Sequence, residues 1–176
     1  KILVTGQHRE MLDQVLEFFK IKPDYDLHLM KPNQTLFDVT ADALRGMNDI
    51  IDEVKPDLII VQGDTTTVFT GALAGYYKKV KVAHLEAGLR TGDKYSPFPE
   101  EMNRILTGHI ADYHWALTEQ ARKNLLNEGI REENIHVVQN TVIDALFLAL
   151  ELLKKEGDSK YEEFFKDIDL SKKIVL

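Results

Sequence analysis

Short apolar runs alternate with segments of helical periodicity along most of the chain. The run at 57–64 is nearly continuous in hydrophobic residues, which is typical of a central parallel strand covered on both faces, and further short runs follow at 80–88, 113–118 and 135–140. Between them, apolar residues recur every three or four positions, as on one face of a helix. This alternation predicts an α/β fold with a Rossmann-like, doubly wound parallel sheet, which binds ligands beyond the carboxyl ends of its strands.

Two helices carry signals at their first turns. Thr35 followed by Asp38 predicts a capping box at the start of a helix that ends before Pro56. Pro97 and Pro99 are expected in the first turn of a later helix. Its buried face is predicted from its apolar residues, and the polar residues Glu100, Asn103 and Arg104 are expected to point elsewhere. The predicted buried face consists of Met102, Ile105, Leu106 and Ile110.

Composition narrows the classes of function. The net charge of -7 argues against a nucleic-acid partner, because phosphate backbones are bound through an excess of Lys and Arg. The absence of Cys excludes disulfides, thiolate metal sites and Cys nucleophiles, and it fits a reducing cytoplasm. No apolar run approaches the roughly 20 residues of a membrane span. The chain begins almost directly in a predicted strand and ends in another, so we expect a piece of a larger protein.

Ionisable residues gather in the stretch 84–104. A strand ends in His84 and Glu86, a polar loop follows, and a helix opens with Glu100 and carries Arg104 one turn later. An acid at the end of a buried strand is partly desolvated, so Glu86 is a candidate acid or base. His84 and Glu86 are expected on one strand face. A salt bridge from Glu86 to Arg90 is the simpler reading of the strand end.

The motif GDTTT at 63–67 places Asp64 and three hydroxyls between a strand and a helix start. Such a helix start could bind phosphate, or Asp64 and the threonines could simply cap the helix. Glu100 and Arg104, four residues apart, could be an ordinary surface pair or could face a shared cleft. We expect the strand ends at 6–9, 63–65 and 84–88 to meet at one edge of the sheet.

Four segments carry a resemblance to a known family: TGQHREMLDQVL, KPDLIIVQGDTTTVFTGALAGYY, VAHLEAGLRTGDKYSPFPEEMNR and NTVIDAL. Over nearly its whole length the chain resembles the bacterial non-hydrolysing UDP-N-acetylglucosamine 2-epimerases. The resemblance implies one domain of a two-domain GT-B fold. Residues 1–170 would form the N-terminal Rossmann-like domain, incomplete at its start, and 171–176 the first strand of a C-terminal domain.

The resemblance also implies an activity and a setting. Family members interconvert UDP-N-acetylglucosamine and UDP-N-acetylmannosamine without NAD or a metal, usually as cytoplasmic homodimers that serve envelope polysaccharide synthesis. The implied partner is a UDP-sugar, with neither nucleic acid nor membrane. The 176-residue chain alone is expected to be inactive, because half of the cleft would be missing.

Site residues follow by matching the family's motifs. Asp64, Glu86 and Glu100 match the family's catalytic acids, and Arg104 matches a further residue of the site. Activation by the substrate at a neighbouring site would involve the positions that match Gln7, His8, Gln34 and Glu100.

Two other functions remain open at this stage. One is the hydrolysing relative of the family, which releases free N-acetylmannosamine. The other is a half domain that binds a UDP-sugar and catalyses nothing.

Overall fold

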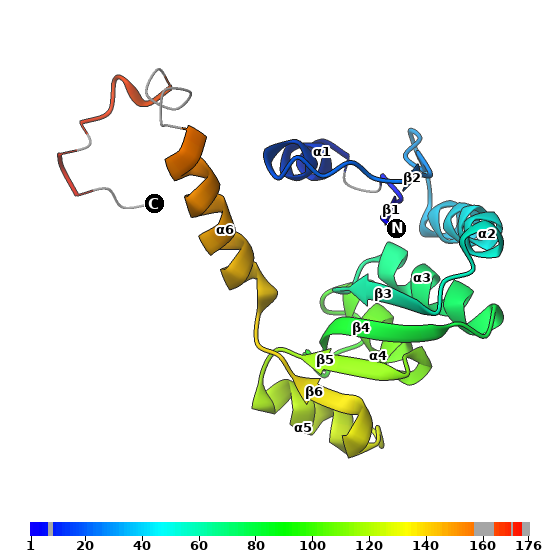
Figure 1. The fold of residues 1–176 in the computed structure, drawn as a ribbon. Helices are drawn as coiled ribbons and strands as arrows, with labels where there is room; N and C mark the ends of the chain where they lie inside the picture. Colours follow the sequence, from blue (N-terminus) through cyan, green and yellow to red (C-terminus); the bar gives the residue numbers. More distant parts are fainter. Residues whose placement is uncertain (7–8, 157–163, 170, 174–176) are drawn as a thin grey trace. The chain divides into compact units, whose positions relative to one another are not determined.

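The computed structural model describes residues 1–6, 9–156, 164–169 and 171–173 (Figure 1). The chain divides into two compact units, Lys1–Gln139 and Asn140–Leu176. The first unit contains every strand of the described residues, and the second contains the last long helix.

Strands and helices alternate along the described chain, with a short strand between the first two helices. In chain order they are β1 (Leu3–Val4), α1 (Arg9–Phe18), β2 (Tyr25–Asp26), α2 (Leu36–Val54), β3 (Leu58–Gln62), α3 (Thr66–Tyr77), β4 (Lys81–Ala87), α4 (Glu100–Ile110), β5 (Tyr113–Ala116), α5 (Glu119–Asn127), the 3-10 turn η1 (Glu132–Asn134), β6 (Ile135–Val137) and α6 (Thr141–Glu156).

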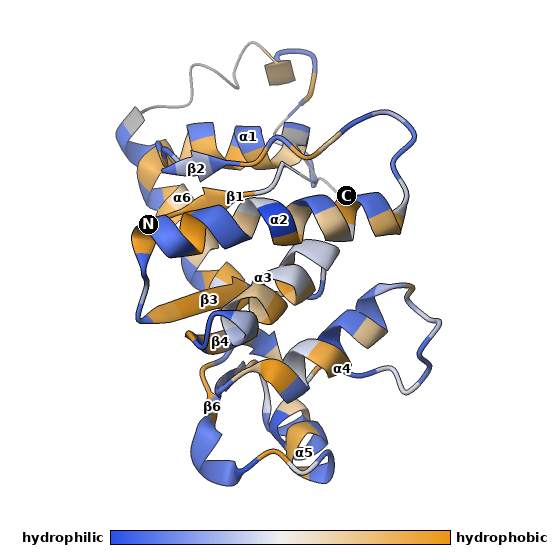
Figure 2. Ribbon diagram, turned by 90° about the vertical axis from the view of Figure 1, so that its right-hand side faces the viewer, coloured by the Kyte–Doolittle hydropathy of each residue, from blue (hydrophilic) through white to orange (hydrophobic). Residues whose placement is uncertain are grey.

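All strand pairs are parallel, which confirms the predicted α/β class. Four strands form one sheet in the order β3-β4-β5-β6, and β1 pairs with β2 in a separate two-stranded sheet. The prediction of a central strand at 57–64 is wrong for the described residues, since β3 lies at an edge of its sheet. It is hydrophobic along its length (Figure 2), yet Leu58 and Ile60 are 37% and 57% exposed. An apolar run predicts a strand well, but it does not say which edge or face is covered.

Helix α2 begins as its sequence predicts. Thr35 is the N-cap, its side chain accepts a hydrogen bond from the backbone N–H of Asp38, and the Asp38 carboxylate accepts one from the backbone N–H of Thr35. The buried face of α2 carries Met47 and Ile51 into a cluster that includes Ala74 of α3. Helix α3 packs in turn on β3 and β4, so α2 and α3 form one side of the first unit.

Helix α4 differs from its prediction in both its start and its buried face. Its N-cap is Pro99, so both prolines precede the helix rather than occupy its first turn. Leu106 is 40% exposed, although it was expected to be buried. The side chains that α4 buries are polar or absent, namely Glu101, Asn103, Thr107 and Gly108. Ile110 of the predicted face does pack against the apolar cluster that includes Val61 and Val82, but the fully buried positions of α4 are polar ones such as Glu101, which hydrogen bonds hold.

A cavity of about 360 Å³ lies between the β1-β2 sheet, α2 and β3. Its lining is mostly apolar and includes Leu3, Met47, Ile59 and Val61.

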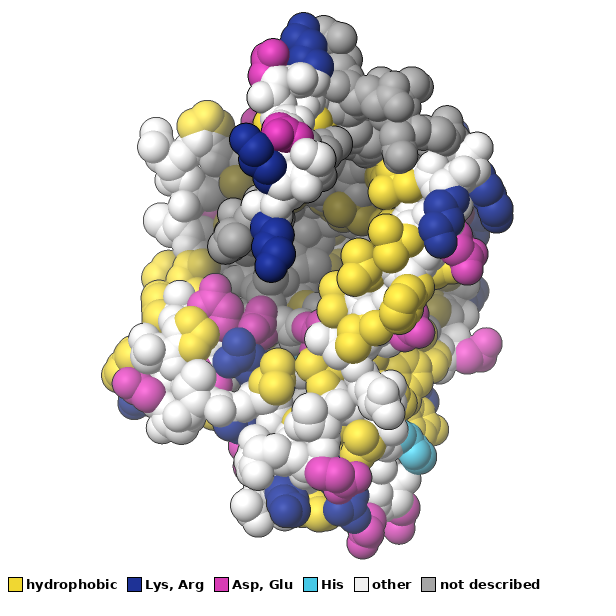
Figure 3. All heavy atoms as spheres, turned by 90° about the vertical axis from the view of Figure 1, so that its left-hand side faces the viewer, with side chains coloured by type: hydrophobic (Ala, Val, Ile, Leu, Met, Phe, Trp, Pro, Cys, Tyr) yellow, Lys and Arg dark blue, Asp and Glu magenta, His cyan; other side chains and the backbone are white. Residues whose placement is uncertain are grey.

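The described surface exposes many hydrophobic side chains among charged ones (Figure 3). In α6 these include Ile143, Leu146, Phe147 and Leu148, each more than half exposed. Within the described part of the chain, no helix is both long and apolar enough to cross a bilayer. The predicted strand at 171–176 depends on residues 174–176, which lie outside the described residues.

Candidate active site

The carboxyl-terminal ends of β3 and β4 lie side by side at one end of the sheet. Gln62 pairs with Leu85, and the backbone N–H of Gly63 donates to the Leu85 carbonyl at 3.0 Å. The chain then turns at Gly63, whose φ of 89° is in the left-handed region, and presents Asp64 beyond the strand. The predicted meeting of these two strand ends is therefore confirmed.

The end of β1 approaches the same region. The hydroxyls of Thr5 and Thr67 are 2.8 Å apart, which joins the end of β1 to the first turn of α3. Gln7 and His8, which follow directly, lie outside the described residues. Thr65 is the N-cap of α3, but its side chain makes no capping hydrogen bond. The Thr65 side chain therefore does not cap α3, although capping was one of the two roles predicted for GDTTT.

Glu86 occupies a bulge at the end of β4. The register with β5 jumps from Leu85 to Ala87, so Glu86 has no partner in the ladder, and its φ is 68°. A bulge changes the direction in which a side chain points, and a residue other than glycine is strained at this positive φ. Glu86 is partly exposed and accepts a hydrogen bond from Gln62 Nε2 at 3.3 Å. The alternation that predicts a face shared with His84 is therefore interrupted at Glu86.

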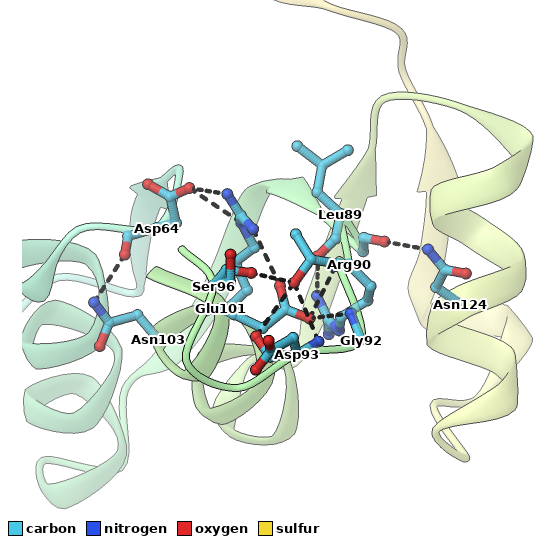
Figure 4. Close-up of polar contacts among 12 residues, drawn as sticks. Asp64, Leu89, Arg90, Gly92, Asp93, Ser96, Glu101, Asn103 and Asn124 are labelled. Atoms are coloured by element: carbon cyan, nitrogen blue, oxygen red, sulfur yellow. Dashed lines mark hydrogen bonds and ion pairs between the residues drawn. The ribbon is translucent and has the colours of Figure 1, made fainter. Parts of the chain in front are cut away.

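Asp64 is held by α4 through two residues (Figure 4). Arg104 donates to Asp64 Oδ2 from Nε at 3.0 Å and from Nη2 at 2.5 Å. Asn103, buried one position earlier, donates from Nδ2 to the Asp64 backbone carbonyl at 2.8 Å. Among the described residues, the side-chain donors of Asp64 both bond Oδ2, and none donates to Oδ1.

Arg104 also contacts Glu101, a fully buried carboxylate that the sequence motifs did not single out. Arg104 Nη1 donates to Glu101 Oε2 at 3.1 Å, and the backbone N–H groups of Thr91 and Gly92 each donate to Oε1 at 3.0 Å. Burial would raise the pKa of Glu101, but the backbone donors and the Arg104 guanidinium outweigh it and hold the pKa below its ordinary value. Glu101 is therefore a buried anion. The signal available in the sequence was its place three residues before Arg104.

Two simpler interpretations of the charged residues are wrong. Arg104 does not pair with Glu100, because its guanidinium lies between Asp64 and Glu101. Arg90 does not pair with Glu86 either. Its Nε and Nη2 each donate to the Glu128 carboxylate at 2.7 Å, which ties the loop after β4 to the end of α5.

Glu100 is the first residue of α4 and is partly exposed. It forms no ion pair or hydrogen bond with the described residues. A carboxylate at this position is favoured by the helix dipole. It follows the 91–99 loop directly and lies one turn before Arg104 in the same helix.

Two histidines are buried beneath the site. His84 and His114 pair in register on β4 and β5 and are 0% and 1% exposed. His84 Nε2 lies 2.8 Å from the Gly63 carbonyl, and Nδ1 of each ring has no partner. Burial lowers the pKa of His84, and burial with its neighbour His84 lowers that of His114 to about 4. Both rings are neutral near pH 7, so a structural role in packing the strands suits them better than proton transfer.

The predicted neighbouring site is only partly described. Gln34 precedes the N-cap of α2, and its Oε1 accepts a hydrogen bond from the Lys31 backbone N–H at 2.7 Å. Its Nε2 is buried without a partner. No group of three His, Asp or Glu side chains that could hold a metal ion occurs in the described part of the chain.

Comparisons with known proteins agree with one another. The family model described as "UDP-N-acetylglucosamine 2-epimerase" matches residues 1–176. The chain is similar to an enzyme of that name from Yersinia pestis, with 51% identity over all of this chain and 47% of the relative. It is also similar to a putative one from Thermotoga maritima, with 59% identity over 82% of this chain and 38% of the relative.

Solved structures show the same likeness. The structure of UDP-GlcNAc 2-epimerase from Neisseria meningitidis bound to UDP-GlcNAc matches with a TM-score of 0.88 and 48% identity, over 97% of this chain and 47% of that one. The Methanocaldococcus jannaschii UDP-GlcNAc 2-epimerase in complex with UDP-GlcNAc and UDP matches with a TM-score of 0.83 and 40% identity, over 93% of this chain and 44% of that one. The chain thus spans about half the length of these relatives. With the parallel sheet, these likenesses confirm the predicted Rossmann-like domain of a GT-B-type fold.

Proposed function

Because this chain belongs to the UDP-N-acetylglucosamine 2-epimerase family, we propose that the protein interconverts UDP-N-acetylglucosamine and UDP-N-acetylmannosamine. The observation that carries the proposal is that Asp64 and Glu86 follow the paired ends of β3 and β4, while α4, which begins at Glu100, bonds Asp64 through Arg104. Two of the similar structures, from Neisseria meningitidis and Methanocaldococcus jannaschii, are complexes with UDP-GlcNAc.

The chemistry of the sugar requires several acids and bases. The proton at C2 has no adjacent carbonyl and is not acidic. Departure of UDP from C1 gives C1 oxocarbenium character, which acidifies the C2 proton, and a base then completes an elimination to a glycal. Addition of UDP to C1 with protonation of C2 from the opposite face inverts C2. The route needs carboxyl groups on both faces of the ring.

The described residues suit these roles. Asp64 Oδ1 accepts no hydrogen bond from a described residue, and the bulge separates the Glu86 carboxylate from the ladder. Glu100 is the first residue of α4, the helix whose Arg104 holds Asp64. We assign the three jointly as acid and base groups. Arg104 orients Asp64 and stabilises negative charge near it.

Solvent deuterium tests the elimination. In D₂O the full-length protein should place deuterium at C2 of both UDP-sugars, as read by mass spectrometry and NMR. Asp64→Asn, Glu86→Gln and Glu100→Gln should each lower kcat by about 100-fold or more. Glu133→Gln, on an exposed carboxylate of η1, is the matched control and should keep full activity. Turnover without deuterium at C2 would contradict the elimination, and stoichiometric release of free N-acetylmannosamine would indicate the hydrolysing reaction instead.

The finer features of the family belong to the same proposal. We propose a cytoplasmic homodimer that serves envelope polysaccharide synthesis, with 1–170 in the N-terminal domain and 171–176 opening the second. Gln7, His8, Gln34 and Glu100 would bind an activating substrate molecule. The 176-residue chain alone should bind UDP weakly, as measured by calorimetry, and turn over no substrate. Turnover by this chain alone would contradict the assignment of half of the cleft to a second domain.

A further inference from the structure

Glu101 is the one acidic side chain among the buried residues that the structure describes. It lies in the first turn of α4, next to Glu100, and has no access to a ligand. A carboxylate buried in this way is stable only if its hydrogen bonds replace the lost water. Its three donors come from two different elements, the loop after β4 and α4 itself.

The two oxygens of Glu101 have separate partners. Oε1 accepts from the backbone N–H groups of Thr91 and Gly92, and Oε2 accepts from Arg104 Nη1. The loop that Oε1 holds is closed further by the Thr91 hydroxyl, which donates to the Ser96 carbonyl at 2.5 Å. One side chain therefore holds both the loop that leads to Glu100 and the Arg104 guanidinium. Figure 4 shows Glu101 beside Gly92 of that loop.

Arg104 passes this constraint on to Asp64. The Arg104 side chain is only 14% exposed, and its planar guanidinium contacts Glu101 through Nη1 and Asp64 Oδ2 through Nε and Nη2. Because Oδ2 takes both of these bonds, Oδ1 is the oxygen left for a reacting group. Rotation of the guanidinium away from Glu101 would release Oδ2 and leave the Asp64 carboxylate free to turn.

We infer that Glu101 is a positioning residue, which acts through Arg104 to fix which oxygen of Asp64 reacts. This inference rests on the proposed epimerase function. A carboxylate is required at Glu101 because both of its oxygens accept. In Glu101→Gln the amide oxygen can face only one of its two sets of donors, so the NH₂ group opposes either the loop amides or Arg104.

A double-mutant cycle on the full-length protein tests this. Glu101→Gln should lower kcat by about 10- to 100-fold and change KM by less than about 3-fold, because orientation is lost in the chemical step. In the Arg104→Met background the same change should lower kcat by less than about 3-fold, since the connection to Asp64 is already broken. An equal loss in both backgrounds, or no loss in the wild-type background, would overturn the inference.

Glu128→Gln is the matched control. It removes a carboxylate from Arg90, another guanidinium that ties down the loop after β4, but that pair does not contact Asp64. Its effect on kcat should be small and additive with Arg104→Met. If Glu101→Gln does not fold, Glu101→Asp enters the same cycle, because the shorter carboxylate cannot reach both sets of donors.

A second readout separates this inference from the proposed function. The carboxyl carbon chemical shift of Asp64, followed by NMR at pH 7, should change in Glu101→Gln and stay unchanged in Glu128→Gln. If the wild-type protein turns over no UDP-sugar, the proposed function fails, while this shift still decides the role of Glu101. An unchanged shift in Glu101→Gln would overturn the inference by itself.

Discussion

His114 should make the protein less stable as the pH falls below neutrality. The ring is 1% exposed, and burial is the largest cause that lowers its pKa from 6.5 to about 4, followed by the neighbouring ring of His84. Arg90 lowers the pKa further, whereas a hydrogen bond to the Ala111 backbone and the charge of Asp112 oppose the shift. The folded state therefore binds the proton more weakly than the unfolded chain does.

Proton linkage gives the sign and the size of the change in the free energy of unfolding. Because the folded pKa is depressed, the stabilisation is fully present above pH 6.5 and is lost as the pH falls toward about 4. At pH 5 an unfolded imidazole is about 97% protonated, and the folded one about 10%. The free energy of unfolding should fall by about 2 kcal/mol between pH 7.5 and pH 5 through this residue, and by about 3 kcal/mol in total.

Urea unfolding at both pH values measures the effect. His114→Gln keeps a donor for the Ala111 carbonyl and cannot titrate, so its loss of stability on acidification should be about 2 kcal/mol smaller than that of the wild type. His136→Gln, on the exposed neighbour in β6, should follow the wild-type pH dependence. Equal pH dependence of wild type and His114→Gln would refute the reasoning.

Two further predictions concern backbone conformation. Gly88→Ala should destabilise the protein by about 3 kcal/mol or more, because an added Cβ would lie 2.3 Å from the Ala121 carbonyl oxygen. Gly92→Ala should lower the free energy of unfolding by only about 1 kcal/mol. Its φ of 81° is also left-handed, but the added Cβ would meet no atom within 4 Å. Thermal unfolding of both variants checks this, and equal losses would contradict it. Glu86→Gly should raise the free energy of unfolding by about 1 kcal/mol, because glycine adopts a φ of 68° without strain, while activity is lost. A less stable Glu86→Gly protein with full activity would contradict the assignment of strain and function to the same residue.

The order of elements could be predicted from the sequence, because apolar runs and helix caps are local signals. Thr35 and Asp38 form the capping box that their spacing indicates. The strand ends that carry Asp64 and Glu86 do meet. Each of these predictions uses residues that are neighbours in the sequence or occupy equivalent ends of parallel strands.

The partners of the charged residues could not be predicted in the same way. Arg104 bonds Asp64, 40 positions away, and Arg90 bonds Glu128, 38 positions away. Spacing favoured the local pairs, whereas the observed partners are distant in the sequence and are brought together only by the tertiary fold. Glu101 was missed for a related reason, because a buried carboxylate on a helix breaks the hydrophobic pattern that identifies a buried face.

The outer edge of β3 has a consequence for handling this polypeptide. Within the described residues nothing hydrogen-bonds to that edge, and Leu58 and Ile60 are exposed beside it. An unpaired, apolar strand edge is a template on which another extended chain can add a strand. Concentrated solutions of the 176-residue chain are therefore expected to associate through β3, and a charged residue in place of Ile60 should keep them dispersed.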